Sequence, residues 1–148
     1  MIDPTKPLEV VHSKDPALDP SMDWVEYLRT RDPALIKDSP TKRATRFVLH
    51  PLSGTSREDI DDRYQTLSAR HRAAFQVAIR QIIAHSSTEE VPTIKVGEYR
   101  VCTAEWYESF KVKYGLNFIY TLGSIAYALS GEPSTDPFLD SRSDSQPG

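Results

Sequence analysis

Apolar and polar residues follow several distinct patterns along the 148-residue chain, and the clearest of them is helical. Between residues 57 and 84, apolar side chains recur at steps of three and four, which places them on one face of an α-helix. Acidic residues open this segment and basic residues lie towards its end, an order that complements a helix dipole. The pattern predicts one long amphipathic helix with an apolar face made of Ile60, Tyr64, Leu67, His71, Phe75, Ala78 and Ile82.

Shorter segments on both sides have the alternating pattern that is typical of strands. Residues 45–49 predict one strand. Residues 94–96 and 99–101 predict the two arms of a hairpin, because Gly97-Glu98 between them suits a tight two-residue turn. These segments together predict a small antiparallel sheet of about three strands.

Two further helices are predicted near the C-terminus. Thr103 is a suitable N-cap for a helix that runs to about residue 114, and a mostly apolar helix follows at 116–129. Gly123 and Ala126 in the second helix are small enough to let another helix approach closely. The predicted fold class is α+β, mainly α-helical: the long helix and the C-terminal helices pack on a small antiparallel sheet with a β-hairpin.

Proline and charge divide the chain into three parts. Six of the eleven prolines lie in residues 1–40, which predicts an extended N-terminal arm with short helical turns. Residues 41–131 are predicted to be a single α+β domain. Residues 132–148 are rich in Ser, Asp and Pro, and they are predicted to be a disordered acidic tail.

The net charge of −3 conceals an uneven distribution. The arm and the tail each carry −3, whereas residues 41–85 carry +4. A basic middle between acidic ends favours docking between copies or onto another protein.

The acidic total argues against a protein that coats nucleic acid, and the apolar stretch at 116–129 is too short to cross a bilayer. A single cysteine excludes an internal disulfide, and no secretory signal is visible, so a reducing compartment is expected.

The usual catalytic and cofactor motifs are absent from the sequence. The four histidines have no metal-ligand spacing, so neither a metal nor a cofactor nor a small-molecule substrate is predicted. His71 has two interpretations, a general base or a partly buried structural histidine, and Cys102 is either a nucleophile before a helix or a buried thiol. The structural interpretation is favoured for both residues, and a small hydrolase or transferase is the least favoured class.

Two groups of side chains are candidate binding surfaces. The first group is aromatic and aliphatic and lies in the arm and in the C-terminal helices: Trp24, Tyr27, Leu28, Trp106, Phe110, Phe118 and Leu122. The second is basic and lies along the predicted long helix: Arg63, Arg70, Arg72 and Arg80. Ordinary solvated surface is the favoured interpretation of the basic group, followed by an acidic protein partner and then by phosphate contacts to nucleic acid.

The order of the elements resembles that of small tail-assembly and minor structural proteins of tailed bacteriophages and prophages. The residues that carry the resemblance are Asp32-Pro33-Ala34-Leu35 in an acidic segment, the strand and turn at 45–52, the Gly97-Glu98 hairpin and the helix at 116–129. The C-terminal helices depart from such proteins in being more aromatic, and they lack an acidic closing turn.

The resemblance implies a non-enzymatic protein–protein interaction component in the assembly of a phage tail or neck. Its partners would be other virion or assembly proteins or further copies of the same chain, in the host cytoplasm or in the virion. The alternative is a regulatory or host-directed binding module that uses the basic face from Arg63 to Arg80.

Overall fold

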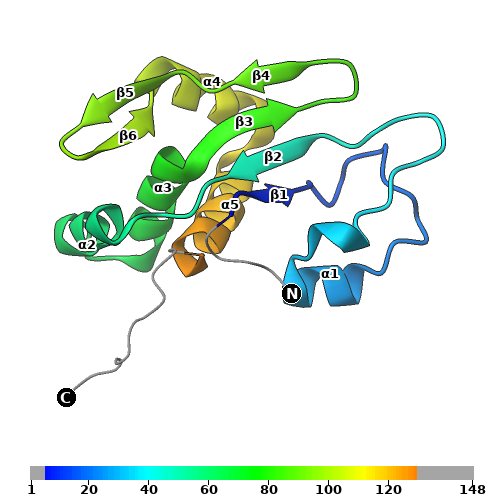
Figure 1. Ribbon diagram of the computed structural model, residues 1–148, viewed down its shortest axis with the longest axis horizontal. Helices are drawn as coiled ribbons and strands as arrows, with labels where there is room; N and C mark the ends of the chain where they lie inside the picture. The colour runs from blue at the N-terminus through cyan, green and yellow to red at the C-terminus, as the bar shows by residue number, and fades with distance from the viewer. Residues whose placement is uncertain (1–5, 130–148) are drawn as a thin grey trace.

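The structure is a computed structural model that describes residues 6–129 of the chain (Figure 1). The predicted strand at 45–49, the hairpin and both C-terminal helices are confirmed, and so is the α+β, mainly helical class. The elements in chain order are β1 (Leu8–Val10), α1 (Trp24–Thr30), the short 3-10 helix η1 (Pro33–Leu35), β2 (Arg46–Leu49), α2 (Gly54–Arg63), α3 (Leu67–Ala78), β3 (Ile79–Ile83), β4 (Thr88–Glu90), β5 (Thr93–Val96), β6 (Tyr99–Cys102), α4 (Ala104–Tyr114) and α5 (Leu116–Ala128).

Four strands form an antiparallel sheet in the order β1-β2-β3-β4, and β5 and β6 form a separate two-stranded hairpin. Helices α4 and α5 lie behind the sheet in the view of Figure 1, and α3 packs closely along α5. The main core lies between these layers and is strongly aromatic. The ring of Phe47 in β2 stands edge-on to three rings from the helices, at centroid distances of 5.8 Å to Phe110, 5.1 Å to Tyr114 and 4.9 Å to Phe118.

The prediction of one long helix over 57–84 is wrong, because the segment forms two helices and a strand. Helix α2 ends at Arg63, and Thr66 then starts α3 by accepting a hydrogen bond from the backbone N–H of Ala69 at 3.2 Å. The carbonyl oxygens left at the end of α2 are satisfied by Arg70, whose guanidinium donates to Tyr64 O at 2.8 Å and to Asp61 O at 3.2 Å. Polar contacts of this kind form a tight corner between the two helices. The apolar residues continue at steps of three and four across this corner, so their spacing alone predicts one continuous helix.

The last part of the predicted helix is the strand β3, and a bulge explains why its pattern looks helical. Ile82 pairs with Phe47 but Ile79 pairs with Leu49, so one residue of β3 is extra at this point. The extra residue places Ile79 and Ile82, three apart, on the same buried face. A strand with this bulge therefore mimics the step of three that is typical of a helix.

The N-terminal segment is not an arm separate from the domain, and this corrects the predicted boundary at residue 40. Strand β1 pairs with β2, with Leu8 opposite Leu49 and Val10 opposite Phe47, so the segment supplies an edge strand of the main sheet. The segment also has a small apolar core of its own, which consists of Val11, Ala17, Met22, Tyr27 and Ala44. The predicted disordered tail at 132–148 lies outside the described residues.

The close approach of helices predicted at Gly123 is confirmed. Its Cα faces the backbone of His71 in α3 so closely that an added Cβ would lie 1.9 Å from the carbonyl oxygen. Ala126, one turn further along α5, is fully buried. These two small residues let α5 lie against α3 and fix the position of the α5 N-terminus, which forms part of the groove described below.

Candidate functional site

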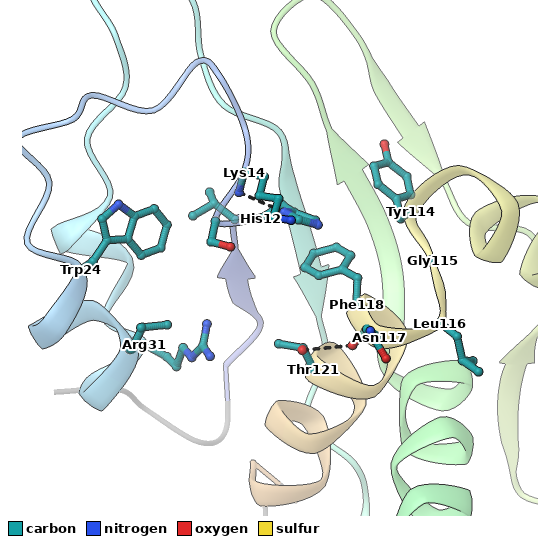
Figure 2. Close-up of a pocket in the computed structure, with 13 residues that line it drawn as sticks. His12, Lys14, Trp24, Arg31, Tyr114, Gly115, Leu116, Asn117, Phe118 and Thr121 are labelled. Atoms are coloured by element: carbon teal, nitrogen blue, oxygen red, sulfur yellow. Dashed lines mark hydrogen bonds between the residues drawn. The ribbon is translucent and has the colours of Figure 1, made fainter.

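A groove of about 720 Å³ separates the N-terminal segment from the junction of α4 and α5 (Figure 2). We call it the α1–α5 groove. One wall comes from the end of β1 and from α1, and the other comes from residues 114–118 and Thr121. The walls are far apart in the sequence but close in space, because β1 joins the sheet that α5 covers.

Six of the thirteen residues that line the groove have aromatic or aliphatic side chains. Figure 2 shows Trp24 on one side of the groove and Phe118 on the other. The Trp24 ring stands edge-on to Tyr27 at 5.6 Å, and the ring of Phe118 lies 4.3 Å from that of His12. Leu28 of α1 also lines the groove and is 53% exposed. The groove therefore offers a water-accessible apolar surface.

The charges of the groove all have one sign. Lys14 and Arg31 line it together with the imidazole of His12, and no aspartate or glutamate is among the lining residues. Within residues 6–129, neither Lys14 nor Arg31 forms an ion pair. The whole chain carries −3, so a cationic groove without a carboxylate is a marked departure from the average surface.

Hydrogen bonds and backbone geometry hold the cationic residues in place. The backbone N–H of Lys14 donates to His12 Nδ1 at 3.1 Å, which fixes the turn after β1. Arg31 ends α1 in a left-handed conformation with φ of 54°, and its guanidinium lies 5.5 Å from the Tyr27 ring centroid. Glycine is the usual residue in this conformation, because a side chain costs about 1 kcal/mol there. Arginine occupies this position in spite of that cost.

Gly115 forms the opposite corner of the groove, between α4 and α5. Its φ of 91° and ψ of 154° are accessible to glycine and strained for other residues. The sharp change of direction lets Tyr114 and Leu116 both line the groove, although they belong to different helices. The predicted boundary between the helix that ends near residue 114 and the helix that begins at residue 116 is thus confirmed, and Gly115 at this boundary shapes one wall of the groove.

A second, smaller groove of about 280 Å³ lies further along α5. It is lined by Leu8 and Thr30 on one side and by Ile125 and Leu129 on the other. Arg31 lines both grooves, so the two adjoin at this residue. Together they form a path beside α5 from its C-terminal end to its N-terminal end. We call the smaller one the exit groove, because the described chain ends beside it at Leu129.

The three predicted contact residues of the N-terminal segment have different positions. Trp24 and Leu28 line the α1–α5 groove. Tyr27 is fully buried, and its hydroxyl accepts a hydrogen bond from the backbone N–H of Val11 at 3.3 Å. The prediction of Tyr27 as a contact residue is wrong in this fold, because the side chain holds α1 against the end of β1.

The predicted contact residues of the C-terminal helices are mainly core residues. Phe110 is buried and Leu122 is completely buried. Their assignment to a binding surface is therefore corrected. Trp106 is half-buried and donates its indole N–H to Glu89 Oε2 of β4 at 2.7 Å. Phe118 is mostly buried, but its ring forms part of the wall of the α1–α5 groove. The aromatic content of these helices fills the core of the chain itself.

The predicted basic face is not continuous, because its four arginines lie on three elements. Arg63 pairs with Asp59 at 2.8 Å within α2, and Arg70 caps the end of that helix. Arg80 in β3 donates to its neighbour's carbonyl and to that of Arg100 at 3.1 Å. Arg72 in α3 is exposed. Most of these cations therefore serve the fold of the chain.

Cys102 and His71 have the surroundings of structural residues. Burial raises the pKa of the Cys102 thiol to about 11, so the nucleophilic thiolate is scarce at neutral pH. Burial also lowers the pKa of His71, whose ring lies 5.5 Å from that of Tyr127. Both observations agree with the favoured interpretation of these residues.

The sequence contains little signal for the cationic residues of the groove. His12, Lys14 and Arg31 lie in a Pro-rich segment without periodicity, and the wall that faces them begins only at Tyr114. Only the pairing of β1 with β2 brings these parts together. The three-residue strand β1 is too short to predict from its alternation.

In comparisons with known proteins, no family model, curated protein or solved structure matches the chain. None of the helices within residues 6–129 combines the length and the apolar character needed to cross a membrane. Over the same residues, no three His, Cys, Asp or Glu side chains gather as a metal site would require.

Proposed function

We propose that the protein is a protein–protein interaction component without enzymatic activity, and that its α1–α5 groove binds an acidic segment of a partner. The observation that carries this proposal is the composition of the groove, in which two cations and an imidazole stand beside aromatic walls without any carboxylate. A segment with a carboxylate next to a phenylalanine or leucine satisfies both features. The carboxylate would meet Lys14 or Arg31, and the apolar side chain would lie between Trp24 and Phe118.

We further propose that this interaction serves the assembly of a phage tail or neck, with other virion or assembly proteins as partners. The support is the resemblance in element order described above. A protein with this role would work in the host cytoplasm or remain in the virion. The alternative of a regulatory or host-directed module on the arginines has less support, because Arg63, Arg70 and Arg80 already bind groups of the chain itself.

Selection from a displayed library of random peptides tests the binding chemistry. The expected peptides combine Asp or Glu with an adjacent Phe, Leu or Trp. Lys14→Glu and Leu28→Glu are each expected to weaken binding of a selected peptide about tenfold or more, because one reverses the charge of the groove and the other places a carboxylate in its apolar wall. Raised salt is expected to weaken the same peptides.

Lys95→Glu is the matched control for the charge reversal. Lys95 is exposed in β5, in the hairpin, and is not a lining residue of the groove. This variant is expected to bind a selected peptide like the wild type. Peptides without acidic enrichment, or an equal loss of affinity in Lys95→Glu, would contradict the proposed site.

Co-expression with the products of the adjacent genes tests the assembly role, because phage assembly genes are clustered. At least one of these products is expected to co-purify with the wild type and to be lost with Leu28→Glu. A wild-type protein that stays monomeric at high concentration and retains none of these products would contradict the assembly role, whatever peptides the groove selects.

A further inference from the structure

We propose that the segment Asp136-Pro137-Phe138-Leu139-Asp140 of the same chain occupies the α1–α5 groove and competes there with a partner. This inference rests on the proposed function, because it assumes that the groove binds acidic and apolar segments. It adds a regulatory property, namely that an external partner must displace the C-terminal segment of the chain.

The chemistry of the segment matches that of the groove. Phe138 and Leu139 are the only large apolar residues among residues 130–148, and an aspartate lies on each side of the pair. Residues 132–148 carry a net charge of −3, whereas the groove contains two cations and no carboxylate. The pair suits the apolar walls, and the flanking carboxylates suit Lys14 and Arg31.

The last described residue of the chain, Leu129, also lies where the C-terminal segment could reach the α1–α5 groove. Leu129 lines the exit groove, and Arg31 joins this groove to the α1–α5 groove. The helical path from Leu129 back to Phe118 is about 17 Å, from the rise of 1.5 Å per residue. Nine extended residues from Leu129 to Phe138 span up to about 30 Å. The segment can therefore run beside α5 and place Phe138 near Phe118 with length to spare.

Occupation within one chain is favoured over exchange between two copies. A short flexible connection gives a tethered segment an effective concentration of about a millimolar, well above the micromolar concentration of the protein in a typical experiment. A segment that binds its groove with a dissociation constant of about 0.1 mM would then occupy it most of the time and weaken a competing peptide about tenfold.

Full-length variants of the segment provide the test, with the indole NMR resonance of Trp24 as the readout. Trp106→Phe serves only to assign the two indole signals. Phe138→Ser with Leu139→Ser, and separately Asp136→Asn with Asp140→Asn, are expected to shift the Trp24 resonance. The matched control is Glu132→Gln with Asp144→Asn, which changes the charge equally but lies outside the proposed segment, and it is expected to leave the resonance in place.

A synthetic peptide of residues 132–142 provides the second measurement. Its affinity is expected to be about tenfold higher for the Phe138→Ser, Leu139→Ser protein than for the wild type, because the groove of that variant is empty. Lys14→Glu in the same background is expected to abolish this gain. An unchanged Trp24 resonance together with equal peptide affinity in variant and wild type overturns the inference.

Two further outcomes separate the possible failures. A Trp24 shift in the wild type that depends on protein concentration means that the segment enters the groove of another copy, which overturns occupation within one chain. Failure of the tail peptide to bind any variant, while library peptides still bind through Lys14, overturns this inference and leaves the proposed function standing. Loss of both kinds of binding contradicts the proposed function itself.

Discussion

At the scale of single residues, burial decides the chemistry of Cys102. The sequence places this thiol at the end of a strand and just before a helix N-terminus, a position that lowers thiol pKa values when the sulfur is exposed. In the structure the side chain is only 5% exposed, and burial raises its pKa to about 11. Loss of water around the sulfur therefore outweighs the opposing effects of the Arg80 charge and of a backbone hydrogen bond on the pKa.

Alkylation of Cys102 at pH 8 tests this argument. The native thiol is expected to react with iodoacetamide about a hundredfold more slowly than the unfolded thiol, because its raised pKa reduces the thiolate fraction and burial hinders access. Rates in buffer and in guanidinium are compared by mass spectrometry, and Cys102→Ser corrects for reaction at other groups. Equal rates in the two solvents would show that the sulfur is accessible and ionised.

Arg31 is the residue at which backbone geometry and the proposed site coincide. Its left-handed conformation is the one positive-φ position outside glycine among residues 6–129. A glycine would end α1 with less strain but would remove the cation from the wall that the two grooves share. Backbone strain of this kind is often found at functional sites, which agrees with a role for the Arg31 side chain in the groove.

At the scale of elements, the sequence predicts a helix or strand correctly where its apolar pattern agrees with the residues that mark its ends. The hairpin has alternation on both sides of Gly97, and α4 has an N-cap at Thr103 and a break at Gly115. The predicted helix over 57–84 fails because its boundaries consist of polar contacts and a bulge. Neither the caps of Thr66 and Arg70 nor the extra residue in β3 changes the apolar spacing.

The packing of α3 against α5 depends on the absence of a side chain at Gly123. Gly123→Ala is expected to lower the free energy of unfolding by about 3 kcal/mol, because a methyl group cannot fit beside the His71 carbonyl unless the helices move apart. Urea denaturation followed by circular dichroism measures the change. The Trp24 resonance is expected to move as well, since α5 carries Phe118 of the groove.

Ser124→Ala is the control for this substitution. It changes the neighbouring residue of α5, which is half-buried and whose hydroxyl, among residues 6–129, donates only to the carbonyl of Thr121 in the same helix. The expected change in unfolding free energy is within about 0.5 kcal/mol. Alanine has a higher helix propensity than glycine or serine, so propensity alone would stabilise both variants. A Gly123→Ala variant as stable as the wild type, or a loss of the same size in Ser124→Ala, would contradict the close helix–helix contact at Gly123.

At the scale of the whole molecule, the N-terminal segment determines both the shape of the fold and the existence of the groove. Trp24 and Leu28 could be selected from the sequence, because exposed aromatic and aliphatic residues in a Pro-rich segment indicate docking. Their position across a groove from α5 could not, because it depends on a three-residue strand and on a buried arginine. A candidate site that is shared by the two ends of a chain becomes visible only when the topology is known.

The buried arginine is Arg46, which fixes the return of the N-terminal segment to the sheet. Its guanidinium donates two hydrogen bonds to Asp38, at 2.7 and 3.0 Å, and one to the carbonyl of Ala44 at 2.9 Å. Burial tends to raise the pKa of Asp38, but the bonds from Arg46 and from the backbone N–H of Ala44 outweigh it and hold the pKa below its ordinary value. A carboxylate with a lowered pKa stabilises the fold above its unfolded pKa, and this stability disappears as the pH falls through the folded value.

Asp38→Asn is therefore expected to destabilise the protein most at neutral pH. The variant leaves the buried Arg46 without its main anion, and the expected loss is about 2 kcal/mol in the free energy of unfolding at pH 7. Below about pH 4 the wild type loses the same interaction by protonation, so the two stability curves are expected to converge there. Urea titrations at a series of pH values measure both curves.

The control for this pair is Asp62→Asn, which removes an exposed carboxylate from α2. Asp62 forms no ion pair within the described residues, so the stability curve of Asp62→Asn is expected to follow that of the wild type.

The Trp24 resonance of Asp38→Asn adds a test of the architecture. If Asp38→Asn shifts Trp24 before the main sheet unfolds, the N-terminal wall of the groove can open independently of the core. A single transition for both signals would show that groove and core form one cooperative unit, as the pairing of β1 with β2 implies.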